Sequence, residues 1–281
     1  MGIQNNIHET ISSLTSAEKR AAHALLANYP SVGLATVAEF ASEAATSAPT
    51  ILRFVARLGF ESYPDFQRAL RSEIEAGLLS PLQKRHPDTH LNEPEPTTIS
   101  QHVECVDQNM RTTLNAVPKS EFESACNLIS DTKSGVYFLG GRFTDAIAAY
   151  MASHLRIVRP GIRRFNGQVS TWNDQILDIK PGDVAVILDI RRYQKDLLDV
   201  AKALTNRKVK IILITDVWLS PVSKYAKIVL PCGIETEHTW DSNAALFILA
   251  EAIIVSVTRA NWNKTRKRLQ AIEDLHWNKT E

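Results

Sequence analysis

Two patterns of apolar and polar positions divide the chain. In residues 1–80 the apolar positions recur at three- and four-residue spacing, which predicts amphipathic helices. Beyond residue 100, helical segments alternate with short β-branched runs, at 136–140, 184–190, 210–215 and 227–231, and a further strand is expected near 163–165. Near-continuous apolar strands that alternate with helices predict a parallel sheet covered on both faces. We therefore expect an all-α N-terminal bundle followed by a doubly wound α/β domain.

A proline-rich segment separates the two patterns. Residues 81–100 hold four prolines among polar residues and show hardly any apolar periodicity, which is typical of a linker. The predicted organisation is a helical domain at 1–80, the linker, an α/β domain at 101–260 and a C-terminal helix or tail at 261–281.

The last segment combines apolar residues at near-helical spacing with a basic cluster. The apolar residues are Trp262, Leu269, Ile272 and Leu275, and the basic ones are Lys264, Arg266, Lys267 and Arg268. We interpret it as a docking helix at a subunit interface, because a basic helix face is more often solvated than bound to DNA.

A tight turn at 45–47 joins two short predicted helices. Thr36 is expected to cap the first helix, and Ser47 the second, which runs to about Leu58 before Gly59 ends it. Two short helices joined in this way form a helix-turn-helix, although a generic helical hairpin has the same spacing.

The second of these helices has the chemistry of a DNA-recognition helix. Residues 44–60 contain no acidic side chain, and the helix is expected to pack through Ile51, Leu52, Val55 and Leu58. The residues predicted to contact DNA phosphates or base edges are Ser47, Thr50, Arg53 and Arg57.

Composition limits the classes of function. The 281 residues include 32 Lys plus Arg and 31 Asp plus Glu, a net charge of +1, which excludes a polybasic binder. Residues 1–80 carry six basic and eight acidic side chains, so nonspecific DNA affinity should be low. No uncharged apolar run approaches the roughly 18 to 20 residues that span a bilayer, and no signal peptide is evident, so a cytoplasmic protein without a membrane partner is expected.

Cysteine and histidine positions give no metal site. The three cysteines, Cys105, Cys126 and Cys232, are far apart and fit reduced buried thiols. His86 and His90 are four residues apart, but Pro87 between them argues against a helical metal pair. We predict no metal and no cofactor.

Acidic residues after the last strand allow two interpretations, of which one is acid/base chemistry. Glu235, Glu237 and His238 lie beside Asp241, but the plainer interpretation is a loop in which Asp241 or Ser242 caps the helix at 243–258. We predict no catalytic residue.

Motifs along residues 14–70 indicate a family. A Leu-Thr start is followed by S-x-x-T-[IV]-x-R-F and by L-G-[FY]-x-x-[FY]-x-[DE]-[FL]. The matching residues are Ser47, Thr50, Ile51, Arg53, Phe54, Leu58, Gly59, Phe60, Tyr63, Asp65 and Phe66. This stretch resembles the N-terminal domain of the RpiR/MurR family of bacterial transcriptional regulators, which implies binding to a double-stranded DNA operator. The turn departs from the family pattern, because Ala45 or Thr46 stands where a glycine is usual.

A second motif lies in the C-terminal half. The pattern T-x-x-x-x-S-P-[LIV]-x-x-x-[AS]-[DK]-x-x-[LI] is matched by Thr215, Ser220, Pro221, Ala226 and Leu230. With the order of strands and helices over about 120–260, it resembles the SIS domain that continues this family. The resemblance implies a sheet of flavodoxin-type order and a phosphosugar ligand. In such sheets ligands bind beyond the carboxyl ends of the strands, here the loops 140–145 and 189–196.

Both loops depart from the SIS pattern. SIS domains carry Gly-x-Gly-x-Ser and Ser-x-Ser-Gly-x-Thr, but 140–144 reads GGRFT and 189–194 reads DIRRYQ. Three arginines replace a small-residue phosphate cradle, and guanidinium groups bind carboxylates or phosphates bidentately. The residues predicted to bind a small anion are Gly140, Gly141, Arg142, Thr144, Arg191, Arg192 and Tyr193. Alternatively, Asp189 pairs with an arginine and leaves no net anion site.

These predictions combine into a regulator that assembles as a homodimer or homotetramer. It binds operator DNA, senses a small anionic effector such as a sugar phosphate or carboxylate, and controls a catabolic or transport operon. Two alternatives remain: an enzyme resembling a sugar-phosphate isomerase, which the sheet alone permits, and a regulator whose SIS domain only assembles the oligomer.

Overall fold

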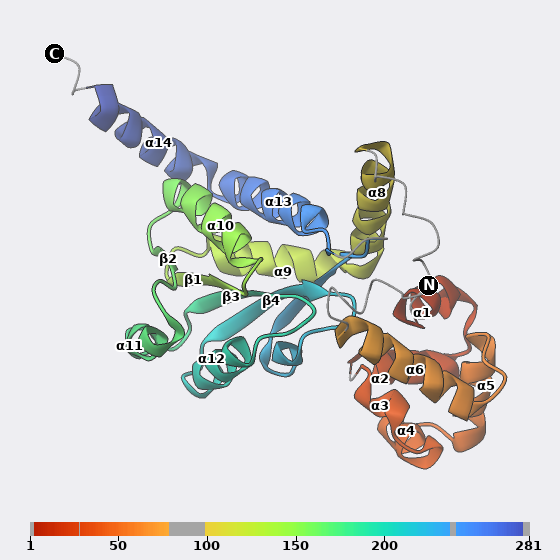
Figure 1. Ribbon diagram of the computed structural model, residues 1–281. Coiled ribbons are helices and arrows are strands. Elements are labelled where there is room, and N and C mark those ends of the chain that lie inside the picture. The colour runs from red at the N-terminus through yellow and green to blue at the C-terminus, as the bar shows by residue number, and fades with distance from the viewer. Residues whose placement is uncertain (1–2, 28, 79–98, 237–239, 278–281) are drawn as a thin grey trace, which may run out of the picture. The chain divides into compact units, whose positions relative to one another are not determined.

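The structure is a computed structural model that describes residues 3–27, 29–78, 99–236 and 240–277 (Figure 1). The chain forms two compact units, Met1–Glu95 and Pro96–Glu281. Of the predicted linker at 81–100, only Ile99 and Ser100 are described, and they begin a helix. His86 and His90 lie outside the described residues.

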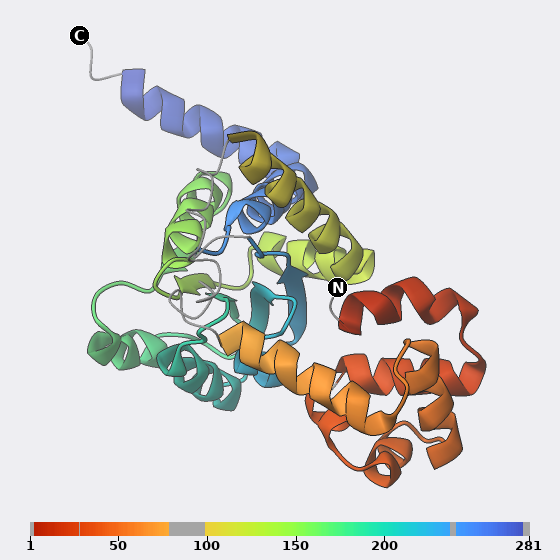
Figure 2. The ribbon, with the colours of Figure 1, turned by 45° about the vertical axis from the view of Figure 1, so that its right-hand side comes forward.

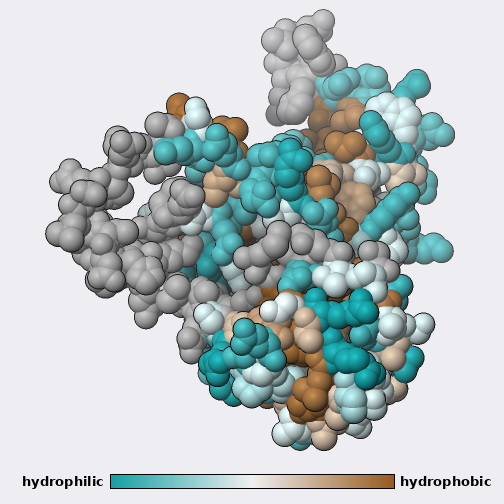
Figure 3. All heavy atoms as spheres, turned by 90° about the vertical axis from the view of Figure 1, so that its right-hand side faces the viewer, coloured by the Kyte–Doolittle hydropathy of each residue, from teal (hydrophilic) through white to brown (hydrophobic). Residues whose placement is uncertain are grey.

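The first unit is helical, as predicted. Its elements are α1 (Ile3–Thr10), η1 (Ile11–Ser13), α2 (Ser16–Ala27), α3 (Ser31–Leu34), α4 (Val37–Glu43), α5 (Ala48–Arg57) and α6 (Tyr63–Leu78). Its largest fully buried side chains include Leu25, Phe40, Ile51, Phe54, Phe66 and Leu70. The rings of Phe40 and Phe54 pack edge to face with centroids 6.3 Å apart, which joins α4 to α5. On the face shown in Figure 3, hydrophobic side chains of this unit lie in small groups between hydrophilic ones.

The turn between α4 and α5 has the geometry of a helix-turn-helix. Thr36 caps α4 in a capping box, since its hydroxyl accepts from the Glu39 N–H and the Glu39 carboxylate accepts from the Thr36 N–H. Ala45 has a φ of +46°, the left-handed conformation for which the family pattern has glycine. Gly59, with a φ of +90°, follows α5 as predicted.

The expected packing face of α5 was wrong at one position. Ile51, Val55 and Leu58 are buried, but Leu52 is 48% exposed. Successive residues of a helix lie 100° apart, so the buried stripe that includes Ile51, Phe54 and Val55 turns Leu52 toward solvent.

The second unit contains a five-stranded parallel sheet of order β2-β1-β3-β4-β5. This is the flavodoxin-type order that the resemblance implied. The strands are β1 (Val136–Gly140), β2 (Ile162–Arg164), β3 (Val184–Asp189), β4 (Lys210–Asp216) and β5 (Ile228–Cys232). The helices are α8 (Ile99–Ala116), α9 (Lys119–Ser130), α10 (Asp145–Val158), η3 (Val169–Thr171), α11 (Trp172–Leu177), α12 (Lys195–Asn206), η4 (Pro221–Tyr225), α13 (Ala244–Ala260) and α14 (Trp262–Trp277).

Helices cover both faces of this sheet (Figures 1 and 2). On one face α9, α10 and α13 bury a core that includes Ile129, Met151 and Ile253. On the other face α11 and α12 close a second core that includes Ile176 and Leu204. This arrangement brings all five strands' carboxyl ends to one edge, where the predicted binding loops lie.

The last two helices, α13 and α14, lie at a sharp angle to each other. Among the described helices, no single one is long and apolar enough to cross a membrane. Only α13 and α14 together reach that length and hydropathy, and they meet at 99°. The three cysteines form no disulfide with one another; Cys126 and Cys232 are buried, and Cys105 is half-buried rather than buried as expected.

Candidate nucleic-acid interface and anion site

One face of α5 is exposed and free of acidic groups. The exposed residues on and just before this helix are Ser47, Pro49, Leu52, Arg53, Ala56 and Arg57. Small, apolar and cationic side chains on a short helix can approach base edges and phosphates without repulsion from a carboxylate.

Thr50 and Ser47 lie differently from what their sequence positions suggest. Thr50 is buried, and its hydroxyl accepts a hydrogen bond from Arg53 Nη2 at 3.1 Å. Ser47 stands at the N-cap position but makes no bond to a helix N–H; its hydroxyl instead lies 2.9 Å from that of Thr50. Thr50 is therefore placed to orient Ser47 and Arg53, which are both exposed.

Arg57 is tied to another helix. Its Nε lies 3.4 Å from Glu18 Oε1, and its Nη1 donates to the Ser13 carbonyl at 3.3 Å. Glu18 is buried in a capping box with Thr15, whose backbone N–H lowers the pKa of Glu18 more than the nearby Arg57 charge does. Within the described residues Arg53 has no such carboxylate within 4 Å, so it is the more available cation of the pair.

The loop after β1 is closed on itself. The Thr144 hydroxyl donates to the Leu188 carbonyl at 2.6 Å and accepts from the Gly141 N–H at 2.8 Å. A side chain at Gly140 would stand 2.5 Å from the Asp145 nitrogen, so only glycine fits where β1 turns into α10. Gly140, Gly141 and Thr144 thus shape the loop from within.

The loop after β3 is fixed by a buried carboxylate on β4. Asp216 accepts hydrogen bonds from the Arg191 N–H, from the Tyr193 hydroxyl at 2.8 Å and from the Trp218 N–H at 2.9 Å. Burial raises the pKa of Asp216 to about 7, and the three donors offset part of that shift. Burial likewise raises the pKa of Tyr193, whose hydroxyl therefore serves as a donor.

Asp189 does not take the role that the alternative interpretation gave it. Its carboxylate accepts from the Ser220 hydroxyl at 2.5 Å and from the Gln194 N–H at 3.3 Å. Among the ion pairs of the described residues none joins Asp189 to an arginine. Burial raises the pKa of Asp189 to about 6, against the effect of these two hydrogen bonds.

Arg191 is paired internally, but with a different carboxylate. Its Nη2 lies 2.9 Å from Asp241 Oδ1, and its guanidinium carbon lies 4.2 Å from the centre of the Trp218 ring. Of the two residues predicted to cap α13, Asp241 or Ser242, Asp241 pairs with this buried cation instead. Asn243 occupies the N-cap position, and the Ser242 hydroxyl accepts from the Ala244 N–H at 3.3 Å.

Arg142 and Arg192 remain at the surface. Their guanidinium carbons lie 5.4 Å and 5.8 Å from the centre of the same ring, Phe143. The Trp240 ring packs edge to face on Phe143 with centroids 5.8 Å apart, and these rings are 55% and 43% exposed. Two exposed cations and two exposed aromatic rings, Arg142, Arg192, Phe143 and Trp240, thus form one cluster at the carboxyl ends of the strands.

The aromatic part of this cluster was not predicted from the sequence. Phe143 stood inside a predicted loop but was given no role, and Trp240 lies too far along the chain for any local pattern to join the two. Of the suggested acid/base group, Glu237 and His238 lie outside the described residues. In the described part of the chain no three His, Cys, Asp or Glu side chains are grouped to hold a metal ion.

Comparison with known proteins identifies both units. A model described as a helix-turn-helix domain of the rpiR family matches residues 1–77, and a SIS domain model matches residues 128–256. The HTH-type transcriptional regulator HexR of Escherichia coli (strain K12) is 22% identical over 244 residues, which cover 83% of this chain and 78% of HexR.

Two solved structures share the fold. The sugar isomerase domain of an RpiR transcription factor from Sphaerobacter thermophilus superposes with a TM-score of 0.56 at 19% identity, over 63% of this chain and 97% of that one. The Vibrio vulnificus NanR protein complexed with ManNAc-6P superposes with a TM-score of 0.54 at 13% identity, over 98% of this chain and 97% of NanR.

Proposed function

The chain belongs to the RpiR family of helix-turn-helix transcriptional regulators, and we propose from this that α5 binds an operator whose occupancy depends on a small anionic effector. Effector binding is supported by the pair of exposed guanidinium groups, Arg142 and Arg192, beside Phe143. Operator binding is supported by the acid-free face of α5, with Arg53 as its principal cation and Ser47 and Arg57 beside it. Such a protein acts in the cytoplasm, where the operator is.

DNA binding requires a second copy of the chain. The exposed face of α5 spans only a few residues, and a symmetric pair reads two half-sites about one helical turn apart. The first unit carries more acidic than basic side chains, so a single copy would bind DNA weakly. We propose a homodimer, or a homotetramer of two such pairs.

The effector is a sugar phosphate or a carboxylate. ManNAc-6P in the NanR complex supports a phosphorylated sugar for this domain class. Arg142 and Arg192 contact the anion, while Phe143 and Trp240 pack against the apolar face of the sugar or carbon skeleton. Gly140, Gly141 and Thr144 hold the first loop in shape; Arg191 and Tyr193 do the same for the second.

Two observations bear on the rival functions. Asp189 and Asp216 are buried and accept hydrogen bonds from within the protein, which supports binding of a ligand beside Arg142 and Arg192 rather than proton transfer to it. The internal pairing of Arg191 favours a domain used only for assembly, but Arg142 and Arg192 have no such partner among the ion pairs of the described residues.

A thermal-shift panel of sugar phosphates, carboxylates and purine catabolites separates these functions. We expect at least one anion to raise the melting temperature and to change the affinity for the operator, measured by fluorescence anisotropy on DNA upstream of the neighbouring genes. No stabilisation by any anion, with unchanged DNA affinity, would assign the SIS domain to assembly alone. Turnover of a sugar phosphate would instead favour the enzyme.

A further inference from the structure

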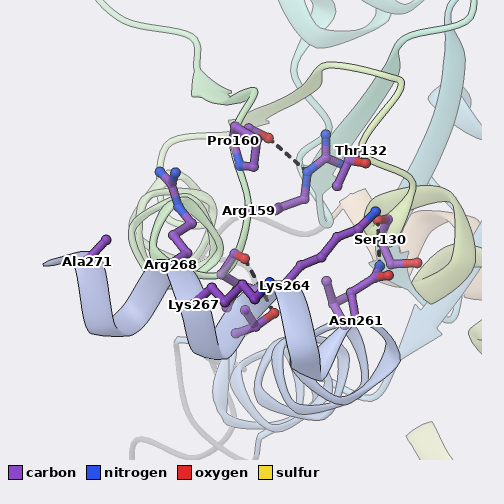
Figure 4. A pocket seen from close by; sticks show the side chains of 12 residues that line it. Ser130, Thr132, Arg159, Pro160, Asn261, Lys264, Lys267, Arg268 and Ala271 are labelled. Atoms are coloured by element: carbon purple, nitrogen blue, oxygen red, sulfur yellow. Dashed lines mark hydrogen bonds between the residues drawn. The ribbon is translucent and has the colours of Figure 1, made fainter.

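A cavity of about 460 Å³ lies at the opposite edge of the sheet from the proposed effector site. It forms where α14 crosses the carboxyl ends of α9 and α10 (Figure 4). Because α10 starts next to the loop of Arg142 and Phe143 and ends at Val158, its 14 residues separate the two places by roughly 20 Å. The cavity is therefore distinct from the effector site.

The lining of this cavity is basic and apolar. Its charged members are Arg159, Lys264, Lys267 and Arg268, and no acidic residue of the described part of the chain contributes to it. Figure 4 shows the two lysines and Arg268 projecting from α14, with Arg159 and Pro160 on the other side. Val158, Pro160, Val257 and Ala271 supply the apolar part of the wall.

Helix capping explains some of these polar groups. Arg159 donates to the carbonyls of Asp131 and Pro160, both at 2.9 Å. Asn261 Nδ2 donates to the Ser130 carbonyl at 3.1 Å, and Arg268 donates to the Arg156 carbonyl at 3.0 and 3.2 Å. Arg159, Asn261 and Arg268 thus satisfy carbonyls at the carboxyl ends of α9 and α10.

Lys264 and Lys267 make no such hydrogen bond to a helix carbonyl among the described residues. Both are exposed, they lie three residues apart on one side of α14, and among the described residues no carboxylate lies within 4 Å of either. Residues 259–272 include no acidic side chain, and Lys264 stands in the first turn of a 16-residue helix, whose dipole adds positive potential there.

We propose that this cavity binds a small organic phosphate, with Lys264 and Lys267 on the phosphate group and the carbon skeleton against Val158 and Pro160. The volume is in the range of small-molecule sites, and lysines serve phosphates as compact point charges. The site is a second one, separate from the effector site, and it does not depend on the proposed function.

Phenyl phosphate is a suitable probe, because it joins a phosphate monoester to an apolar body. The titration is done by calorimetry on the full-length protein carrying Arg142→Ala and Arg192→Ala, so that the effector site does not contribute. In that background Lys264→Ala with Lys267→Ala should weaken binding by at least about tenfold, since two charged hydrogen bonds are lost.

Arg259→Ala with Arg266→Ala is the matched control. Both arginines are exposed, neither lines the cavity, and their removal lowers the net charge equally. This control should keep the dissociation constant within about twofold. Absence of phenyl phosphate binding, or an equal loss in both double variants, overturns the proposal. So does a lysine variant whose sedimentation changes while its phosphate affinity does not, because the cavity would then belong to a subunit contact.

Discussion

Arg191 and Asp241 form a buried ion pair that joins the loop after β3 to the segment before α13. The two atoms, Nη2 and Oδ1, lie 2.9 Å apart, and the side chains are 3% and 10% exposed. Trp218 covers the guanidinium from one side at 4.2 Å. Burying both charges costs solvation, and removing one of them takes away an opposite charge that stabilises the other in a low-dielectric site. The contact therefore keeps two distant segments together once both are in place.

Replacing one partner should destabilise the second unit. We expect Asp241→Ala to lower its free energy of unfolding by about 3 kcal/mol, because the buried Arg191 guanidinium loses this carboxylate. Urea titration followed by tryptophan fluorescence measures this. Asp178→Asn, at an exposed position of the same unit, should change stability by no more than about 0.5 kcal/mol.

A double-mutant cycle isolates the pair. Arg191→Met combined with Asp241→Leu should recover most of the loss, since neither charge remains to be desolvated. A coupling energy within about 0.5 kcal/mol of zero would show that the pair adds nothing to stability.

Local patterns predicted the framework of the fold well. The strand at 136–140 has the predicted bounds, because its apolar run is contiguous in sequence. The strand expected near 163–165 begins one residue earlier, and the helix expected at 243–258 runs from Ala244 to Ala260. Such shifts at element ends arise because capping depends on neighbours that the pattern does not contain.

The roles of the loop residues could not be predicted in the same way. Arg142, Arg191 and Arg192 are the same residue type in adjacent loops, yet Arg191 is buried and the other two are exposed. What separates them is Asp241, which meets Arg191 only through the tertiary fold. Asp241 was predicted only as an alternative to Ser242 for the cap of α13, because a sequence pattern contains local partners alone.

Ala45→Gly should stabilise the first unit. Ala45 adopts a φ of +46°, where a Cβ is strained, and it is exposed, so removing the methyl group opens no cavity. We expect a gain of about 1 kcal/mol in the free energy of unfolding, measured by chemical denaturation of this unit's helical circular dichroism signal. The same change at Ala38, an exposed position inside α4, should instead cost stability. A loss at both positions would contradict the left-handed turn.

Arg53→Ala should weaken operator binding without unfolding the protein. Its guanidinium is exposed on the acid-free face of α5, so we expect about tenfold lower affinity for the operator. The slope of the logarithm of affinity against the logarithm of salt concentration should become shallower by about one. Anisotropy titrations at several salt concentrations measure both. Arg71→Ala, which removes the same charge from an exposed position of α6, is the control. Equal affinities for wild type and the Arg53 variant would rule out α5 as the recognition helix.

Arg142→Ala with Arg192→Ala should abolish the effector response while operator affinity stays unchanged. Both side chains are exposed, so little stability is lost, but the anion loses its cations. The readout is the thermal shift and the change in DNA affinity produced by the effector. Lys180→Ala with Lys227→Ala removes two exposed charges before β3 and β5, at the opposite edge of the sheet, and should respond normally. A normal response in the arginine variant would place the effector elsewhere.

Asp189→Asn should change how stability depends on pH. In the folded state burial raises the pKa of Asp189 to about 6 from its ordinary 3.8. The folded protein therefore holds this proton more tightly than the unfolded chain does. This tighter proton binding stabilises the folded state. The stabilisation is fully present below about pH 4 and is lost as the pH rises through about 6. The asparagine variant lacks the ionisation, so its free energy of unfolding, minus that of wild type, should increase by about 2 kcal/mol between pH 4.5 and 7.5.

Urea titrations across this range test the sign, with Asp178→Asn as an exposed control whose difference from wild type should stay constant. If the free energy of unfolding of the variant, minus that of wild type, falls as the pH rises, the fold stabilises the Asp189 carboxylate. The hydrogen bond from the Ser220 hydroxyl would then lower the pKa of Asp189 more than burial raises it.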